Sequence, residues 1–249
     1  MLELKNITVG YGEKCVLNNL SVSFEKGTLT SIIGANGCGK STLLKAAIGI
    51  LPLSFGEVGI DGASLLSMKR NEVAKSVAYL AQGKSTPDMT VEQMVLHGRF
   101  PYLSYPRRYK AADREMARCA METVGISDLA KKPICELSGG MRQTAYIAMA
   151  LAQYTDYILL DEPTTYLDIA HQLELMHLLR KLADGGKGII TVMHDLPLAF
   201  DFSDEITVIH GGDVVLKASP AEICASDVIN DVFGVRIGRT EKDKFHYQY

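Results

Sequence analysis

A glycine-rich segment at residues 34–42 has the composition and spacing of a phosphate-binding loop. It reads Gly-Ala-Asn-Gly-Cys-Gly-Lys-Ser-Thr, which matches G-x-x-x-x-G-K-[ST], and it lies between an apolar run and a helix-like run at 43–48. The backbone N–H groups of such a loop, and the N-terminus of the helix after it, point at an anion. We expect Lys40 to reach the β- and γ-phosphates of a nucleotide and Ser41 to bind Mg²⁺. The residues expected around the phosphates are Gly34, Ala35, Asn36, Gly37, Cys38, Gly39, Lys40, Ser41 and Thr42.

Two other interpretations of this segment fit less well. A chance glycine-rich turn does not require a strand before it and a helix after it. A dinucleotide-binding fingerprint requires a third glycine, which does not follow Gly37-Cys38-Gly39 at the necessary place.

Two adjacent carboxylates, Asp161 and Glu162, follow the apolar run 157–160. They would lie at the carboxyl edge of a parallel sheet, where open α/β sheets bind ligands. Asp161 suits Mg²⁺, directly or through water, and Glu162 is placed to polarise an attacking water. Such a pair is by itself more often a solvated strand end or a helix cap, but the phosphate loop upstream favours the catalytic interpretation.

A second glycine-rich turn, Leu-Ser-Gly-Gly-Met at residues 137–141, precedes a helical run at 142–152. We call residues 137–141 the signature turn. A glycine-rich turn that opens a helix can bind a second anion. It can equally be a helix cap formed by Ser138, and the local sequence does not decide between these two roles.

The elements that must position these residues follow an α/β pattern. Short, continuously apolar runs are typical of the buried strands of a parallel sheet, and here they occupy residues 29–33, 77–81, 157–160 and 188–193. Helical patterns lie between them, including 168–183, which has Asp168 as its expected N-cap.

Other regions depart from strict alternation of strands and helices. Residues 1–28 and 56–62 resemble short strands of an antiparallel edge. Residues 90–99 and 111–124 have helical patterns, and we interpret them as part of a helical insertion at about 84–145. A hairpin is expected around Gly211-Gly212. The expected domain spans residues 1–234, and residues 235–249 form a short appendage.

Composition excludes several classes of protein. With 47% hydrophobic and 22% charged residues in 249, the chain is not disordered, and its net charge of −3 argues against a general nucleic-acid binder. The five cysteines are odd in number and widely spaced, which indicates reduced thiols rather than disulfides or a zinc site. We expect no signal peptide and no membrane span.

The order of the motifs resembles that of the ATP-binding cassette (ABC) ATPases, from Leu2 to about Gly234. Tyr11 matches the aromatic residue that stacks on adenine in that family, and the signature turn matches the family's signature sequence. Gln82 matches the glutamine that joins Mg²⁺ to the helical insertion, and His194 matches the histidine that contacts the γ-phosphate. The resemblance implies that Glu162, His194 and Gln82 are catalytic and that Ser41, Gln82 and Asp161 surround Mg²⁺.

The resemblance also implies a P-loop NTPase (RecA-like) core with an N-terminal antiparallel β-subdomain and an inserted α-helical subdomain. The family works as a head-to-tail dimer, so Ser138, Gly139 and Gly140 would hold the γ-phosphate of ATP bound by the other copy. Residues 165–168 match the loop that crosses the dimer interface, which brings Asp168 to the nucleotide. Met141 stands where the family usually has Gln or Glu; this departure concerns a polar contact near the ribose and not the phosphate contacts of Ser138 and the glycines.

Within the family, several stretches look like the importers of iron chelates, haem and cobalamin: residues 97–102, 109–114, 147–153 and 164–172. This implies two transmembrane permease subunits as partners, an external solute-binding protein, and a location at the cytoplasmic face of the cell membrane, with no nucleic acid bound. The alternatives are an exporter ATPase or a soluble ABC ATPase of DNA repair or iron–sulfur assembly. The sequence does not identify the solute.

One basic and aromatic segment has three interpretations: RNA binding, a packed surface loop, or a docking site for a helix of the permease. It spans residues 99–110 and contains Arg99, Tyr102, Tyr105, Arg107, Arg108, Tyr109 and Lys110.

Overall fold

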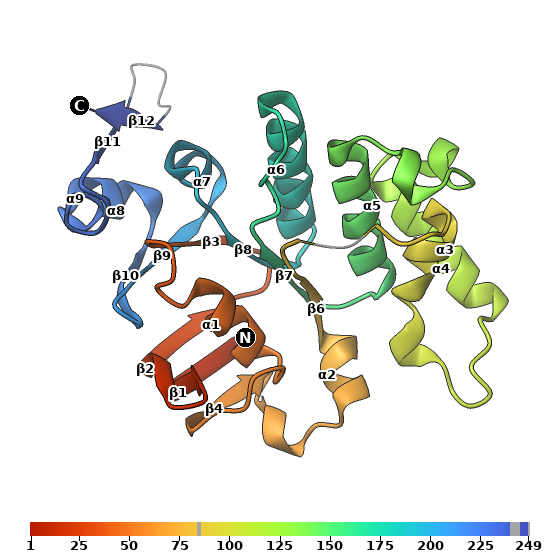
Figure 1. The fold of residues 1–249 in the computed structure, drawn as a ribbon, viewed down its shortest axis with the longest axis horizontal. Coiled ribbons are helices and arrows are strands. Elements are labelled where there is room, and N and C mark those ends of the chain that lie inside the picture. Colours follow the sequence, from red (N-terminus) through yellow and green to blue (C-terminus); the bar gives the residue numbers. More distant parts are fainter. Residues whose placement is uncertain (84–85, 240–244, 249) are drawn as a thin grey trace.

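A six-stranded sheet forms the centre of the computed structural model, which describes residues 1–83, 86–239 and 245–248 (Figure 1). The strand order is β10-β9-β3-β8-β7-β6; β10 is antiparallel to β9 and the other neighbours are parallel. The strands are β3 (Leu29–Ile33), β6 (Val77–Leu80), β7 (Tyr157–Asp161), β8 (Gly188–Val192), β9 (Glu205–His210) and β10 (Asp213–Ala218). The four predicted core strands and the predicted hairpin are therefore confirmed.

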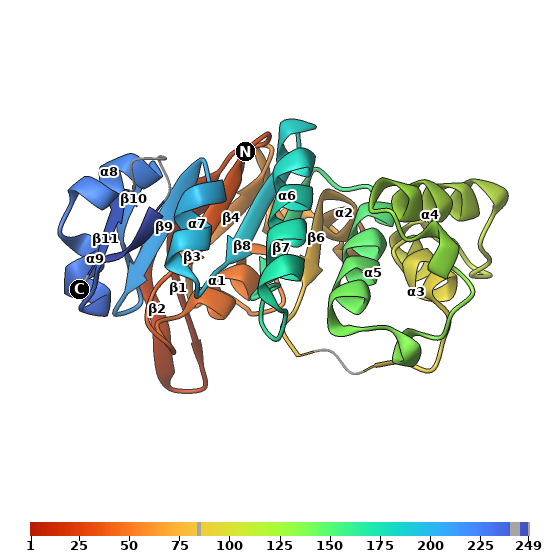
Figure 2. The same ribbon diagram turned by 90° about the horizontal axis from the view of Figure 1, so that it is seen from above.

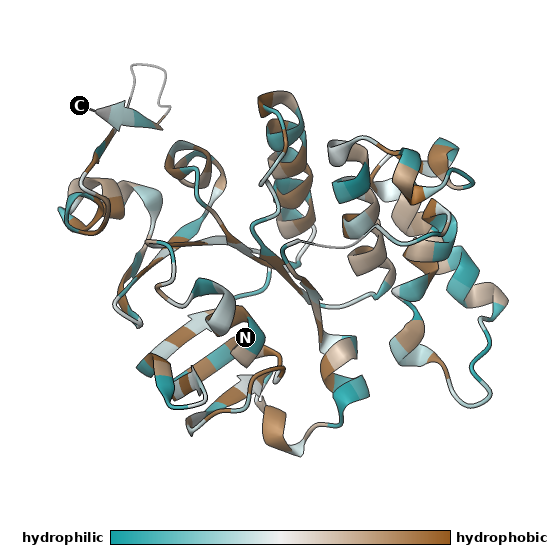
Figure 3. Ribbon diagram, in the orientation of Figure 1, coloured by the Kyte–Doolittle hydropathy of each residue, from teal (hydrophilic) through white to brown (hydrophobic). Residues whose placement is uncertain are grey.

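Both faces of the central sheet are covered, which explains why its strands are apolar at successive positions. Every residue of β3, β7 and β8 is buried. One face packs against α6 (Ile169–Asp184) and α7 (Leu196–Phe202), and the other against α1 (Lys40–Ala47). The apolar colour along these strands is visible in Figure 3.

A second, antiparallel sheet covers α1 from the other side (Figure 1). Its order is β2-β1-β4-β5, and alternate residues of β1 such as Leu2 and Leu4 are buried in the core that contains α1. Its strands are β1 (Leu2–Tyr11), β2 (Lys14–Phe24), β4 (Phe55–Ile60) and β5 (Ala63–Ser64). The expected β-subdomain is confirmed, but it is a separate sheet rather than an edge of the main one, because β1 pairs on both sides within its own sheet.

A helical group lies beyond β6, at one end of the central sheet (Figure 2). It comprises α3 (Val91–His97), α4 (Ala111–Thr123) and α5 (Gly139–Ala152), whose apolar faces share one core, and α2 (Arg70–Ser76) lies between this group and the antiparallel sheet. The helices predicted at 90–99 and 111–124 are confirmed. The expected start of the insertion, at residues 84 and 85, lies outside the described residues.

The C-terminal region contains α8 (Pro220–Ala225), α9 (Val228–Phe233) and the antiparallel pair β11 (Arg236–Arg239) and β12 (Phe245–Gln248). The ring of Phe245 packs edge-on against Phe200 of α7 at 5.1 Å between centroids. Residues 240–244 and 249 of the expected appendage lie outside the described residues. Among the residues described, none of the helices combines the length and the apolar composition needed to cross a membrane.

The position of Arg99 bears on the three interpretations of the segment 99–110, namely RNA binding, a packed surface loop and a docking site for a permease helix. Arg99 is buried; it pairs with Asp113 at 3.2 Å, donates to the carbonyl of Ala152 at 2.8 Å, and stacks on the ring of Tyr102. Arg99 therefore belongs to a packed loop that closes the helical group, and it offers no free charge to RNA or to another protein.

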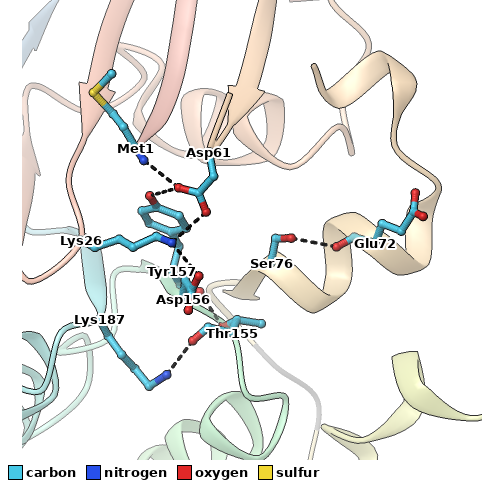
Figure 4. Close-up of polar contacts among 9 residues, drawn as sticks. All are labelled: Met1, Lys26, Asp61, Glu72, Ser76, Thr155, Asp156, Tyr157 and Lys187. Atoms are coloured by element: carbon cyan, nitrogen blue, oxygen red, sulfur yellow. Dashed lines mark hydrogen bonds and ion pairs between the residues drawn. The ribbon is translucent and has the colours of Figure 1, made fainter. Parts of the chain in front are cut away.

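A cluster of charged and polar groups joins the two sheets (Figure 4). Asp61, in the turn after β4, contacts the amino group of Met1 at 2.7 Å, Lys26 at 2.8 Å and the hydroxyl of Tyr157 at 3.1 Å. Lys26 also pairs with Asp156 at 2.7 Å, just before β7. Asp61 thus connects the antiparallel sheet to β7, the strand that leads to the expected catalytic carboxylates.

The contribution of Asp61 to stability should disappear in acid. Burial on its own would raise the pKa of this carboxyl, but hydrogen bonds from Lys26, the amino group of Met1 and Tyr157 outweigh burial and lower it to about 2. Because this lies below the unfolded value of 3.8, the contribution is complete above about pH 4 and is lost as the pH falls toward 2.

Asp61→Asn should therefore lower the melting temperature by a few degrees at neutral pH and have no effect near pH 2, measured by circular dichroism. Asp88→Asn is the matched control, because Asp88 is exposed and has no ion pair or hydrogen bond partner within the described part of the chain. Equal melting temperatures for Asp61→Asn and the parent protein at neutral pH would show that the cluster contributes nothing.

Candidate functional site

The phosphate-binding loop connects β3 to α1 and is shaped by glycines in the left-handed region. Gly37 has φ 78° and open space beside it, and Gly39, the residue before α1, has φ 111°. The side chain of Lys40 is buried and turns back across the loop, where its Nζ donates to the carbonyls of Gly34 at 2.7 Å and Ala35 at 3.1 Å. The ammonium is thus held at the centre of the loop, where an anion would neutralise it.

A cavity of about 300 Å³ opens above this loop and brings distant parts of the sequence together. Tyr11 lies at the end of β1, is 48% exposed and lines the cavity beside the loop, as a residue that stacks on a base must. The other lining residues are Lys14, Val16, Asn36, Gly37, Gly39, Lys40, Ser41, Thr42 and Glu162. The thiol of Cys38 is half-buried, and burial raises its pKa.

Asp161 at the end of β7 is buried and connects this strand to α1. Its Oδ1 accepts a hydrogen bond from Ser41 at 2.8 Å, and its Oδ2 accepts one from the hydroxyl of Tyr79 on β6 at 3.2 Å. Burial, together with the neighbouring carboxylate, raises the pKa of Tyr79, so Tyr79 remains a neutral donor. The converging oxygens of Ser41 and Asp161 are hard ligands of the kind that Mg²⁺ takes, so the site fits this ion.

Glu162 is the residue on which the expected catalytic side chains converge. Its Oε1 lies 2.6 Å from Nε2 of His194, and its Oε2 accepts hydrogen bonds from Gln82 and, at 3.3 Å, from Thr165. Glu162 has φ 52°, a conformation that non-glycine residues rarely adopt and that clusters at functional sites. The structure therefore brings the three expected catalytic residues together, although Gln82 contacts Glu162 rather than Asp161.

The signature turn does not line the cavity above Lys40 within one copy of the chain, although Gly139 lines a neighbouring cavity of about 310 Å³ together with Gln82 and Glu162. Ser138 caps α5, accepting a hydrogen bond from the N–H of Met141 at 3.2 Å, and Asp168 caps α6 by accepting one from the N–H of His171 at 2.9 Å. Among the described residues that line the cavity above Lys40, neither the signature turn nor Asp168 is represented. The two anion sites expected from the sequence are separate in a single copy.

Two contacts of the site are not assigned by the sequence analysis. Tyr79 lies within a strand that was predicted correctly, and its pairing with Leu159 across the β6–β7 ladder places it beside Asp161. The hydroxyl of Tyr79 is the only polar side-chain group in the apolar run 77–81, and this is the sequence signal that could have identified the contact. Thr165 falls in the expected interface loop, but its contact with Glu162 follows only from the three-dimensional path of that loop.

Comparison with known proteins identifies the family. The family model described as ABC transporter matches residues 17–165, more than half of the chain. The chain belongs to the ABC transporter family. Its expected fold is thereby confirmed, and its activity is the hydrolysis of ATP.

Several of the similar proteins of this family are named for import or transport of iron chelates. A petrobactin import ATP-binding protein of Bacillus anthracis is 40% identical over 234 residues, covering 93% of this chain and 86% of that protein. A ferric enterobactin transport ATP-binding protein of Escherichia coli (strain K12) is also 40% identical, with the same coverage. Among solved structures, an inward-facing metal-chelate type ABC transporter matches with a TM-score of 0.85 and 26% identity, covering 100% of this chain and 97% of that chain.

Lys40→Ala should abolish most nucleotide binding or turnover. The substitution removes the one charge that the phosphate loop holds at its centre, and charge-assisted contacts to phosphate are among the strongest hydrogen bonds in proteins. ATPase activity and binding of a fluorescent ATP analogue measure the effect.

Lys45→Ala is the matched control, because it removes the same charge from the last turn of the same helix without touching the loop. Near-parental ATPase activity in Lys40→Ala would refute the phosphate-loop assignment.

Proposed function

We propose that this chain is the ATPase subunit of an importer of iron chelates, acting at the cytoplasmic face of the membrane beneath two permease subunits. Two copies would enclose two molecules of ATP with Mg²⁺. The observation that carries the enzymatic part is the convergence of Gln82, His194 and Thr165 on Glu162 at the cavity above Lys40. The transport part rests on relatives named for petrobactin, iron-hydroxamate and enterobactin import.

The residues of the chain divide the work of hydrolysis among them. The loop amides and Lys40 hold the phosphates, Tyr11 stacks on the base, and Ser41 and Asp161 would hold Mg²⁺, which when bound offsets charge on the phosphate oxygens. Both carboxylate oxygens of Glu162 are already engaged, by His194 on one side and by Gln82 and Thr165 on the other. Glu162 must therefore exchange one partner for the attacking water before it can accept a proton.

The second copy would supply the signature turn, which a single copy does not bring to its own phosphate-binding loop. The signature turn opens α5 but does not line the cavity above Lys40. Next to Asp168, Tyr166 is 93% exposed and Ile169 is 76% exposed, which is unusual for two large apolar residues so close in the sequence. A head-to-tail partner would cover these side chains and place its own signature turn over the ATP.

A permease helix would dock in a cavity of about 710 Å³, on the side of α2 that faces the antiparallel sheet. Most of its wall is apolar, and it includes Ile48, Ile50, Leu65, Leu66, Met68, Arg70, Val73, Val77, Tyr79 and Gln153. Tyr79 also holds Asp161, and Tyr102 of the basic and aromatic segment donates to the carbonyl of Gln153 at 3.0 Å. The site thus lies between the catalytic carboxylate and the helical group, where closure of the ATP dimer would be transmitted to the permease.

Uptake measurements in the source organism test the transport function. Deleting the gene should abolish accumulation of radioactive iron supplied as a hydroxamate or catecholate chelate, and the parent gene should restore it. Supplying haem and cobalamin to the same cells identifies the solute class. Unchanged uptake of every iron chelate in the deletion strain would overturn the importer assignment.

Glu162→Gln should hydrolyse ATP about 10²–10⁴-fold more slowly while still binding it, because the amide keeps the size of the side chain but cannot accept a proton. With its hydrolysis blocked, the protein should accumulate as an ATP-dependent dimer, measured by light scattering with and without nucleotide. Ser138→Arg in the same background should abolish the dimer, because a large side chain would block the opposing phosphate site. A Glu162→Gln protein that stays monomeric at saturating ATP would count against the sandwich.

Leu66→Glu should weaken association with the permease and leave the ATPase activity of the isolated chain near the parental rate. Leu66 is 83% exposed on the wall of the docking cavity, so the carboxylate is tolerated in the free chain but is desolvated when an apolar helix covers it. Val215→Glu on β10 is the matched control, an exposed apolar residue at the opposite edge of the central sheet. Co-purification with the permease and uptake measure the difference, and unimpaired assembly of Leu66→Glu would exclude this cavity.

A further inference from the structure

The imidazole of His171 lies between two segments that are distant in the sequence. His171 is in the first turn of α6, and its Nδ1 is 2.8 Å from each carboxylate oxygen of Asp168, the residue that caps this helix. The other side of the ring lies against Gly140 in the signature turn. The ring thus lies between the start of α6 and the start of α5.

Gly140 has no side chain because the ring occupies that position. A Cβ on Gly140 would lie 2.3 Å from Cδ2, 2.7 Å from Cγ and 2.9 Å from Nε2 of His171, which is too close for any real contact. At Gly139, in contrast, the nearest atom to such a Cβ is the carbonyl oxygen of Tyr166 at 3.8 Å. The requirement for glycine at 140 therefore comes from His171 and not from backbone conformation, since Gly140 lies within helix α5.

We propose that His171 is a positioning residue that fixes the signature turn to the Asp168 loop, so that the two segments facing the second copy move as one unit. This rests on the proposed head-to-tail dimer. Asp168 holds the ring from one side, and the ring in turn sets the position of the first turn of α5, which would receive the γ-phosphate of the other copy.

Two further contacts support this role. The side chain of Gln172 donates to the carbonyl of Thr164 at 3.3 Å, which holds the same loop from its other end. The carboxylate of Asp168 stands near the proposed second anion site and is 66% exposed, and its pairing with His171 turns it toward the ring. His171 does not line the cavity above Lys40, so the affinity of a single copy for ATP should not depend on it.

A double-mutant cycle on the monomer tests the contact itself. Gly140→Ala should lower the melting temperature by several degrees, because the methyl group must displace a ring that Asp168 holds. In a His171→Ala background the same change should be neutral or stabilising, since alanine is the better helix former. Additive effects of Gly140→Ala and His171→Ala would overturn the proposal, whether or not the protein dimerises.

Dimerisation in the Glu162→Gln background tests the positioning role. His171→Ala should raise the ATP concentration for half-maximal dimerisation about tenfold, within the range expected for residues in contact, while the monomer binds a fluorescent ATP analogue as the parent does. His171→Asn, which keeps a donor for Asp168, and His171→Phe, which keeps the ring against Gly140, should each restore part of the loss. His177→Ala is the matched control, because it removes the same side chain from the same helix at a position that packs on Phe202.

The outcomes separate this proposal from the proposed function. Dimerisation of His171→Ala at the parental ATP concentration would overturn the positioning role, as would an equal loss of ATP affinity in the monomer, which indicates general damage to the fold. If the Glu162→Gln parent itself does not dimerise, the sandwich is wrong, and the double-mutant cycle alone then decides whether His171 fixes the signature turn.

Discussion

Parallel pairing in a fixed register is the constraint on which the site depends. Because β3, β8, β7 and β6 run in the same direction, their carboxyl ends reach one edge of the sheet, and Asp161 pairs opposite Val192 at that edge. The phosphate loop, Glu162, His194 and Gln82 each follow one of these strand ends. A shift of a single residue in any pairing would turn these side chains to the opposite face and separate them.

The charged side chains of the site already have hydrogen-bond partners within the chain. Lys40 is satisfied by carbonyl oxygens of its own loop, and both oxygens of Glu162 are occupied by neighbouring side chains. These contacts satisfy buried and half-buried charges that would otherwise be unfavourable. Binding of the nucleotide therefore has to exchange one set of hydrogen bonds for another.

Sequence patterns predicted the elements well where the signal is local. Continuous apolar runs identified the core strands, and the cap at Asp168 was correct, because strand burial and helix capping depend on residues close together in the chain. The pattern of residues 1–28 and 56–62 indicated only an antiparallel edge, because alternation shows that one face is buried but not what covers it; the separate β-subdomain was expected from the family resemblance alone. Tyr79 and the buried Arg99 were not recognised because their partners lie 82 and 14 residues away, and no local pattern marks such contacts.

The charged joint at Asp61 has a consequence for substrate choice. It fixes the antiparallel sheet, which carries Tyr11, to the sheet that carries the phosphate loop, and so it fixes the separation between Tyr11 and that loop. A tyrosine ring contacts the flat face of a base, which adenine and guanine share, and not the edge by which they differ. The proposed stacking on Tyr11 would therefore select for the length of a nucleoside triphosphate more strictly than for the identity of its purine.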